Sequence, residues 1–291
     1  MENFDYIAPR SLAEAYSALG NGRTSLMLAG GTDVIVQLRE GRRTCDQLID
    51  VKHIPEMMAC TFNSDGSLTI GAAVPLAQLY EDPDIQQRFP AIVDAATIIG
   101  GTQIQSRATL GGNLCNASPA ADSSPALMVL GARLVIGSAS GTRELPVEEF
   151  FTGVGRNALQ PGELLVQIRV PAPVPNGGAF YHRFIPRNEM DIAVASAGVS
   201  VVLDSARENI VSARVALGAV APTPIMVPAA AAAVAGKPAS AETFKRAGEA
   251  AAAAASPITD MRGSVAQRKH LAGVLTVRAF EHAVARARGG S

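Results

Sequence analysis

Apolar residues recur at helix and strand spacings through the first half of the chain. Near the N-terminus, Leu12, Ala15 and Leu19 fall on one helical face, and Ser11 and Glu14 are spaced as a capping box. Short apolar runs predict strands at 25–29, 47–51, 67–74, 132–138 and 163–171, and helices are predicted to start at Pro75 and Pro90 and to cover 123–131. Strands that alternate with helical patterns indicate βαβ units.

The pattern changes near residue 175. The segment PAPVPNGG, residues 171–178, has the proline and glycine density of a linker. Beyond it, strand patterning covers 179–184, 192–203 and 210–221, and the rest of the chain, 227–236, 240–256 and 264–290, has helical composition. We therefore predict an α/β portion followed by a smaller α+β portion, in which strands precede helices.

Composition and charge exclude several classes of protein. The 291 residues are 48% apolar, enough for two or three modest domains with real cores. The 25 basic and 26 acidic residues nearly cancel, and no basic run exceeds Arg42-Arg43, so a nucleic-acid partner is not expected. Cys45, Cys60 and Cys115 are scattered, which predicts three buried free thiols in a cytoplasmic protein. No leader and no transmembrane segment are expected.

Two double glycines follow apolar runs: LMLAGGTD at residues 26–33 and ATLGGN at residues 108–113. Glycine lets the backbone approach a ligand, and consecutive N–H groups in such a turn form an anion-binding concavity. Either stretch alone is more typical of a tight turn. Together, as two loops, they are able to hold one diphosphate from both sides without lysine or arginine.

Other motifs point to no familiar chemistry. The chain has no P-loop, and GVGRNA at 153–158 matches a dinucleotide fingerprint but runs into a turn instead of a helix. The four histidines are dispersed, and no nucleophile elbow is present. Asp122 either caps the helix that follows it or contacts a ligand, and the two roles are compatible. Arg183, Arg187 and Asp191 either form ion pairs across strands or belong to a site.

The two glycine stretches, extended to 28–41 and 100–127, closely resemble the FAD-binding (medium) subunit of the molybdenum hydroxylases, the flavoprotein of the xanthine dehydrogenase and carbon monoxide dehydrogenase family. Residues 180–199 and the tail resemble the C-terminal domain of the same family. The resemblance implies an α+β protein with the two-lobed FAD-binding fold of the vanillyl-alcohol-oxidase-like (PCMH) type. It places this domain at 1–174, with lobes at about 1–55 and about 56–174, and at 179–288 a C-terminal domain of three antiparallel strands and a helical bundle.

The resemblance also assigns cofactor contacts. It implies that two glycine loops hold the FAD diphosphate, that Asp122 contacts the cofactor, and that Leu165 lies near the flavin or the adenine. The first loop consists of Ala29, Gly30, Gly31, Thr32 and Asp33, and the second consists of Thr109, Leu110, Gly111, Gly112 and Asn113. The chain departs from many relatives at Arg183, where they have lysine, and from some at Ile99, where they place an aromatic residue against the isoalloxazine. A role for Arg183 beside the flavin stays open.

The function implied by the resemblance is electron transfer. A large molybdopterin subunit hydroxylates the substrate, a small subunit with two [2Fe-2S] clusters conducts the electrons, and FAD in this chain passes them to NAD, oxygen or a quinone. The expected assembly is a dimer of heterotrimers. Two alternatives remain: a standalone flavin reductase of the same fold, and a non-catalytic assembly subunit that has lost the cofactor.

Overall fold

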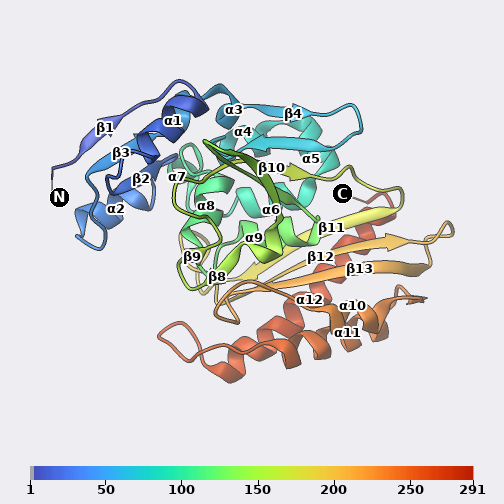
Figure 1. Ribbon diagram of the computed structural model, residues 1–291. Coiled ribbons are helices and arrows are strands. Elements are labelled where there is room, and N and C mark those ends of the chain that lie inside the picture. The colour runs from blue at the N-terminus through green and yellow to red at the C-terminus, as the bar shows by residue number, and fades with distance from the viewer. Residues whose placement is uncertain (1–2, 291) are drawn as a thin grey trace.

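A small parallel sheet flanked by short helices forms the N-terminal lobe of the structure, a computed structural model that describes residues 3–290 (Figure 1). The strand order is β1-β3-β2, and both pairings are parallel. The elements of this lobe are β1 (Asp5–Ile7), α1 (Leu12–Leu19), β2 (Ser25–Leu28), α2 (Val34–Arg39) and β3 (Gln47–Asp50). Half of the predicted capping box is confirmed: Ser11 Oγ accepts a hydrogen bond from the Glu14 N–H at 3.2 Å, whereas the Glu14 carboxylate accepts from the Arg10 N–H at 2.8 Å. The predicted βαβ arrangement is correct here.

The second lobe is built on a different kind of sheet. Its strands follow the order β4-β5-β10-β6-β7, and all four pairings are antiparallel, so the βαβ prediction is wrong for this lobe. The strands are β4 (Cys60–Phe62), β5 (Leu68–Gly71), β6 (Arg133–Ser138), β7 (Gly141–Pro146) and β10 (Leu164–Val170). The physical reason is that β10, which comes last in sequence, pairs between β5 and β6.

Helices fill the long connection between β5 and β6. They are α4 (Leu76–Glu81), α5 (Pro83–Arg88), α6 (Pro90–Ala96), α7 (Thr102–Gln105), α8 (Leu110–Asn116) and α9 (Ser123–Val129), and α3 (Pro55–Met58) precedes the sheet. Pro83 and Pro90 both stand at first helical positions, where a missing backbone N–H has no consequence. The GVGRNA segment lies in the hairpin of β8 (Phe151–Gly153) and β9 (Arg156–Asn157), which agrees with its exclusion as a dinucleotide fingerprint.

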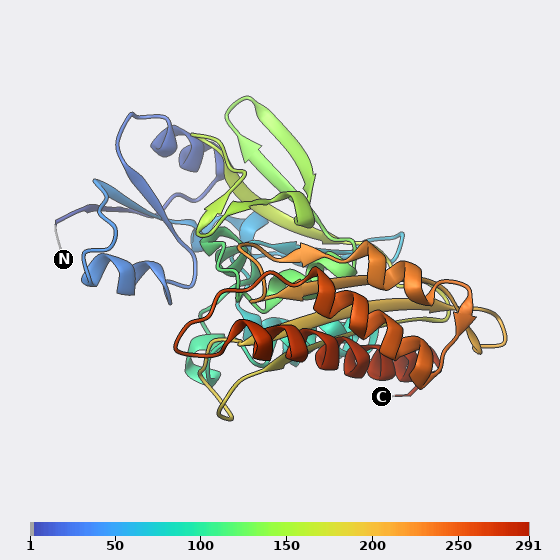
Figure 2. The ribbon, with the colours of Figure 1, turned by 90° about the horizontal axis from the view of Figure 1, so that it is seen from below.

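The C-terminal domain is a three-strand antiparallel sheet with two short additional strands and three helices. Its elements are β11 (Gly177–Phe184), β12 (Ala195–Leu203), β13 (Asn209–Gly218), β14 (Ile225–Met226), α10 (Pro228–Val234), β15 (Lys237–Pro238), α11 (Ala241–Ala254) and α12 (Val265–Ala287). The helices α10, α11 and α12 lie together on one side of this sheet, while α6 and α9 of the second lobe pack on its other face (Figures 1 and 2). The sheet is therefore buried on both sides.

Charged side chains join the C-terminal domain to the second lobe. Asp94 on α6 receives two hydrogen bonds from the Arg286 guanidinium, at 2.6 and 2.8 Å, and one from the Tyr181 N–H at 3.1 Å. Arg214 donates to the Met128 carbonyl at 2.9 Å. Within residues 3–290, no helix has both the length and the apolar content that crossing a membrane requires.

The thiol prediction is only partly correct. Cys45 is buried, but Cys60 is exposed at the edge of the second sheet and Cys115 is half-buried. Cys60 belongs to β4, an outer strand, where one face of the strand remains open to solvent.

Candidate cofactor site

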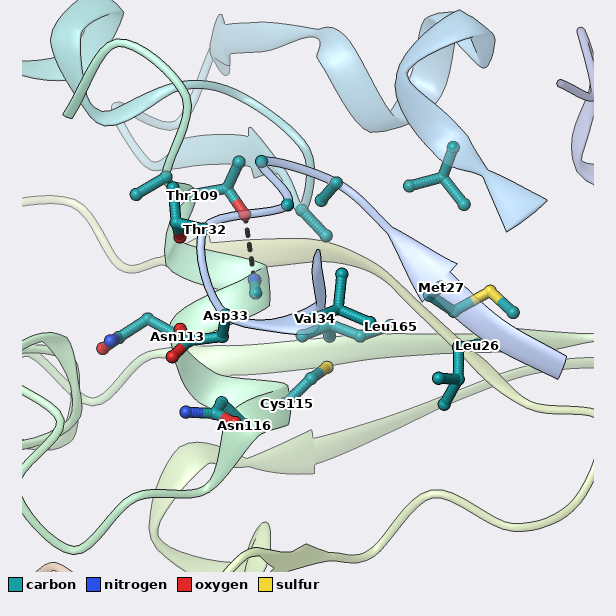
Figure 3. Close-up of a pocket in the computed structure, with 18 of the residues that line it drawn as sticks. Leu26, Met27, Thr32, Asp33, Val34, Thr109, Asn113, Cys115, Asn116 and Leu165 are labelled. Carbon is teal, nitrogen blue, oxygen red and sulfur yellow. Dashed lines mark hydrogen bonds between the residues drawn. The ribbon is translucent and has the colours of Figure 1, made fainter. Parts of the chain in front are cut away.

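A cavity of about 290 Å³ lies between the N-terminal lobe and the second lobe, and both glycine stretches line it (Figure 3). The structure thus brings together segments that are eighty residues apart in the sequence. Of the residues assigned to the cofactor, the following line the cavity: Ala29, Gly30, Gly31, Thr32, Asp33, Thr109, Gly111, Gly112, Asn113 and Leu165. Ile99 also lines it.

The first glycine stretch is an irregular turn between β2 and α2. Within residues 3–290, the N–H groups of Gly30, Gly31 and Thr32 donate to no protein acceptor, although all three residues line the cavity. Gly31 has φ +80°, a conformation that residues other than glycine rarely adopt. Three consecutive unpaired donors at a cavity wall are able to hold an anion without a positively charged side chain.

The second stretch differs from its prediction as a loop. Thr109 is the N-cap of α8, and its Oγ1 accepts a hydrogen bond from the Gly112 N–H at 2.9 Å, so both glycines belong to the first helical turn. Glycine disfavours a helix, but the threonine cap and the fully buried Leu114 outweigh that preference. Asn113, the residue after Gly112, accepts a hydrogen bond from the Ser123 hydroxyl at 2.6 Å through Oδ1. Its amide nitrogen is therefore available to a ligand.

Glycine also permits two close backbone contacts at this site. A Cβ on Gly30 would lie 2.6 Å from the carbonyl carbon of Arg107 and 2.9 Å from Cα of Ala108. A Cβ on Gly111 would lie 2.6 Å from Cβ of Ala72. The first stretch is therefore in direct contact with the backbone that leads into the second, and α8 is in direct contact with the segment after β5.

Polar and apolar residues occupy different parts of the cavity. In Figure 3, Thr32, Asp33, Thr109 and Asn113 gather on one side, while Leu26, Met27, Val34 and Leu165 lie on the other. Asp33 and Arg43 are the charged lining residues within the described part of the chain. Burial raises the pKa of Asp33, and the Arg42 charge opposes that shift. Cys115 also lines the cavity, and burial raises the pKa of its thiol to about 12, which favours the neutral thiol.

Three assigned residues do not line this cavity. Leu110 is buried in the core of the second lobe. Asp122 and Arg183 form a buried ion pair, with 2.7 Å between Arg183 Nη1 and Asp122 Oδ2, and the Tyr181 hydroxyl donates to Asp122 Oδ1 at 2.6 Å. Asp122 stands at the N-cap position of α9 as predicted, but its side chain makes no capping hydrogen bond. The cofactor contacts of these three residues remain predictions.

The pKa of Asp122 is raised, but not far enough to discharge its ion pair with Arg183 at neutral pH. Burial raises the pKa of Asp122 to about 6, although the Arg183 charge and the Tyr181 hydroxyl oppose that shift. Burial and the neighbouring Asp122 also raise the pKa of Tyr181. Arg187 and Asp191 pair at 3.6 Å within the loop after β11, and Arg183 pairs with Asp122, so neither ion pair crosses between strands as predicted.

Sequence reasoning missed two amides beside the cavity, of which Gln37 joins the two lobes and Asn157 acts within the second lobe. Gln37 on α2 donates to Asn116 on α8 at 3.2 Å, and both residues line the cavity. Asn157 donates to the Cys115 carbonyl at 2.8 Å and holds the end of α8. Nothing local in the sequence marks these amides, because their roles depend on a contact between distant segments.

The site fits a dinucleotide cofactor. Unpaired backbone N–H groups, glycines whose Cβ atoms would meet other backbone, and short polar side chains suit a diphosphate. The apolar side suits an aromatic ring system. Two lobes with a dinucleotide-sized cavity between them and a third, sheet-and-helix domain are the arrangement of an FAD-binding subunit.

Comparison with known proteins identifies the family. Residues 2–173 match the FAD binding domain in molybdopterin dehydrogenase, and residues 180–283 match the CO dehydrogenase flavoprotein C-terminal domain. The chain belongs to this family of FAD-binding oxidoreductase subunits, which confirms the family, the fold class and the FAD cofactor inferred from the sequence.

Individual relatives match over nearly their whole length. The xanthine dehydrogenase FAD-binding subunit of Escherichia coli O157:H7 is 34% identical over 285 residues, which cover 98% of this chain and 97% of that protein. The carbon monoxide dehydrogenase medium chain of Hydrogenophaga pseudoflava is 32% identical over 285 residues, which cover 97% of this chain and 98% of that protein. The structure of that organism's carbon monoxide dehydrogenase lacking the Mo-pyranopterin moiety superposes with a TM-score of 0.93 at 31% identity and covers 98% of each chain.

Proposed function

We propose that this chain relays electrons within a molybdenum-containing hydroxylase. It accepts them from the [2Fe-2S] clusters of a small partner subunit and passes them to NAD, oxygen or a quinone, while a large molybdopterin subunit transforms the substrate. The observation that carries this proposal is the cavity of unpaired N–H donors between two lobes, in a chain that matches FAD subunits over nearly their whole length. FAD would supply the redox chemistry.

The residues of this chain bind and orient the cofactor. The N–H groups of Gly30, Gly31 and Thr32 and the amide nitrogen of Asn113 are proposed to donate to the diphosphate. Apolar residues on the other side of the cavity then hold one ring system and exclude water from it. These are Leu26, Met27, Val34 and Leu165. Asp122 and Arg183 are proposed to contact the cofactor from the boundary with the C-terminal domain.

The organisation of the chain is part of the same proposal. We place the FAD-binding domain at 1–174 and the C-terminal domain at 179–288, which the family matches at 2–173 and 180–283 support. The proposed assembly is a dimer of heterotrimers. The cytoplasm is the proposed compartment because a reducing environment suits the three free thiols.

The test is purification of the full chain from its native host under conditions that preserve complexes. We expect a yellow preparation with one FAD per chain and two co-purifying subunits, one containing molybdenum and one containing iron–sulfur clusters. Substrate of the complex should reduce the flavin only when both partners are present. An active flavoprotein without partners would contradict the relay and favour a standalone reductase, whereas a colourless protein that takes up no added FAD would favour an assembly subunit.

A further inference from the structure

A lysine lies behind the first glycine stretch, outside the cavity wall. Lys52 follows β3, and its ammonium group donates to the Ala29 carbonyl at 3.0 Å and to Asp50 Oδ1 at 2.6 Å. The side chain of Lys52 is 21% exposed and that of Asp50 only 5%. Lys52 does not line the cavity, so its ammonium reaches the cofactor site only through the backbone of Ala29.

Asp50 fixes the position of this ammonium group. The Tyr6 hydroxyl donates to Asp50 Oδ2 at 2.5 Å, and the Lys52 N–H donates to Oδ1 at 3.0 Å. Burial alone would raise the pKa of Asp50, but hydrogen bonds from Lys52 and Tyr6 outweigh it and hold the pKa below its usual range. The carboxylate is therefore charged, and an ion pair this confined leaves the lysine little rotational freedom. The pair has no net charge, so any effect on a ligand acts through the hydrogen bond from Lys52 to the Ala29 carbonyl.

The Ala29 carbonyl and the Gly30 N–H belong to one peptide unit. That unit is planar and trans, as the structure contains no cis peptide bond between residues 3 and 290, so its C=O and N–H point in opposite directions. Lys52 binds the oxygen and thereby sets the direction of the N–H, which has no protein acceptor within the described residues. A charged donor on the oxygen also polarises the peptide and strengthens its N–H as a donor.

We propose that Lys52 is a positioning residue for the cofactor diphosphate, acting through the Ala29–Gly30 peptide. This inference rests on the proposed role of the first glycine stretch in holding the diphosphate. Lys52 orients and polarises one backbone donor from behind the first glycine stretch, without adding net charge to the site. The competing explanation is a purely structural link, because Leu28 on β2 pairs with Asp50 on β3 and Lys52 joins the two strand ends.

The two explanations differ in which part of the cofactor they affect. A positioning role concerns the diphosphate alone, so it changes the binding of ADP but not of adenosine. A structural link supports the whole lobe, so its loss weakens both ligands together. The ratio of the two dissociation constants therefore separates the explanations.

The experiment uses the full chain after FAD has been removed, with FAD, ADP and adenosine as probes in titration calorimetry. Lys52→Met removes the ammonium, and Lys52→Met with Asp50→Asn removes the pair without leaving a buried unpaired carboxylate. Lys245→Met, on the exposed face of α11, is the matched control for the lost charge. If Lys52→Met does not fold, the double variant carries the test.

Both variants should raise the dissociation constants of FAD and ADP by about tenfold and change that of adenosine by less than about twofold. A tenfold change is the size expected for losing one charge-assisted hydrogen bond. The Lys245→Met control should match the wild-type chain. Equal weakening of ADP and adenosine, or no change in either, overturns the inference while wild-type FAD binding stands. A wild-type chain that binds neither FAD nor ADP would instead refute the proposed function.

Discussion

Alanine at Gly30 should separate the two glycine stretches that form the cofactor cavity. The new Cβ would lie 2.6 Å from the carbonyl carbon of Arg107 and 2.9 Å from Cα of Ala108, and both atoms are backbone. Ordinary contact needs the two segments to move apart by roughly 1 Å, and overpacking of this kind costs about 1–3 kcal/mol. Backbone atoms cannot change rotamer to relieve the overlap as a side chain can. We therefore expect a loss near the upper end of this range, about 3 kcal/mol of unfolding free energy.

The same movement should weaken cofactor binding. A shift of about 1 Å breaks or bends the donors of one stretch relative to the other, and two lost charge-assisted bonds would raise the FAD dissociation constant by at least about a hundredfold. Gly20→Ala is the control, since Gly20 has φ −85° and its added Cβ would lie 3.3 Å from the Tyr16 carbonyl. Denaturant unfolding and FAD titration measure both effects. A Gly30→Ala chain that keeps stoichiometric FAD and wild-type stability would refute the argument.

Three further substitutions test neighbouring features. Gly31→Ala should reduce FAD retention, measured as flavin per chain, more than Gly22→Ala does. Both glycines have positive φ, but only at Gly31 would a Cβ contact Leu28, at 2.9 Å. Equal losses of flavin would mean that backbone strain alone matters. The pKa of Asp122 is raised to about 6, so between about pH 4 and pH 6 its carboxyl keeps a proton in the folded chain that it has lost in the unfolded chain. The contribution of Asp122 to the unfolding free energy therefore falls as the pH rises through that window. Asp122→Asn should remove that fall in denaturant unfolding measured at pH values on either side of the window, and an unchanged pH profile would contradict the assignment. Arg286→Met should lower the unfolding free energy by about 3 kcal/mol, because it leaves the half-buried Asp94 carboxylate without its cation. Arg246→Met, in an exposed pair, should lower the unfolding free energy by less than about 0.5 kcal/mol. Similar losses for the two variants in calorimetry would contradict an interdomain role for Arg286.

Local signals in the sequence predicted local structure well. The Ser11 cap of α1, the proline at the start of α6 and the strand patterning of β12 each depend on residues within one element, and each is confirmed. The antiparallel order of the second sheet could not be predicted in the same way. It requires β10 to pair with β5, whose last residue precedes it by more than ninety positions, and no local pattern carries a pairing of that range.

The residues of the site show the same difference between local patterns, which the sequence reveals, and long-range contacts, which it does not. Both glycine stretches stand out in the sequence, and the structure brings them to one cavity. Lys52 and Gln37 do not stand out, because a lysine near the end of a strand and a glutamine on a short helix are ordinary surface residues by type. Their roles arise from contacts with Ala29 and Asn116, which only the folded chain creates.

The four glycines of the two stretches answer to different physical demands. Gly30 and Gly111, the first of each pair, are required by packing, because a Cβ on either would collide with neighbouring backbone or with Ala72. Gly31 is required by its positive φ, and a Cβ on Gly112 would meet only Thr109 Oγ1, at 3.0 Å. The repeated double glycine is thus only partly a ligand-binding pattern. Since Gly30 belongs to the N-terminal lobe and packs on residues 107 and 108 of the second lobe, a residue proposed to bind the diphosphate also sets the distance between the two lobes.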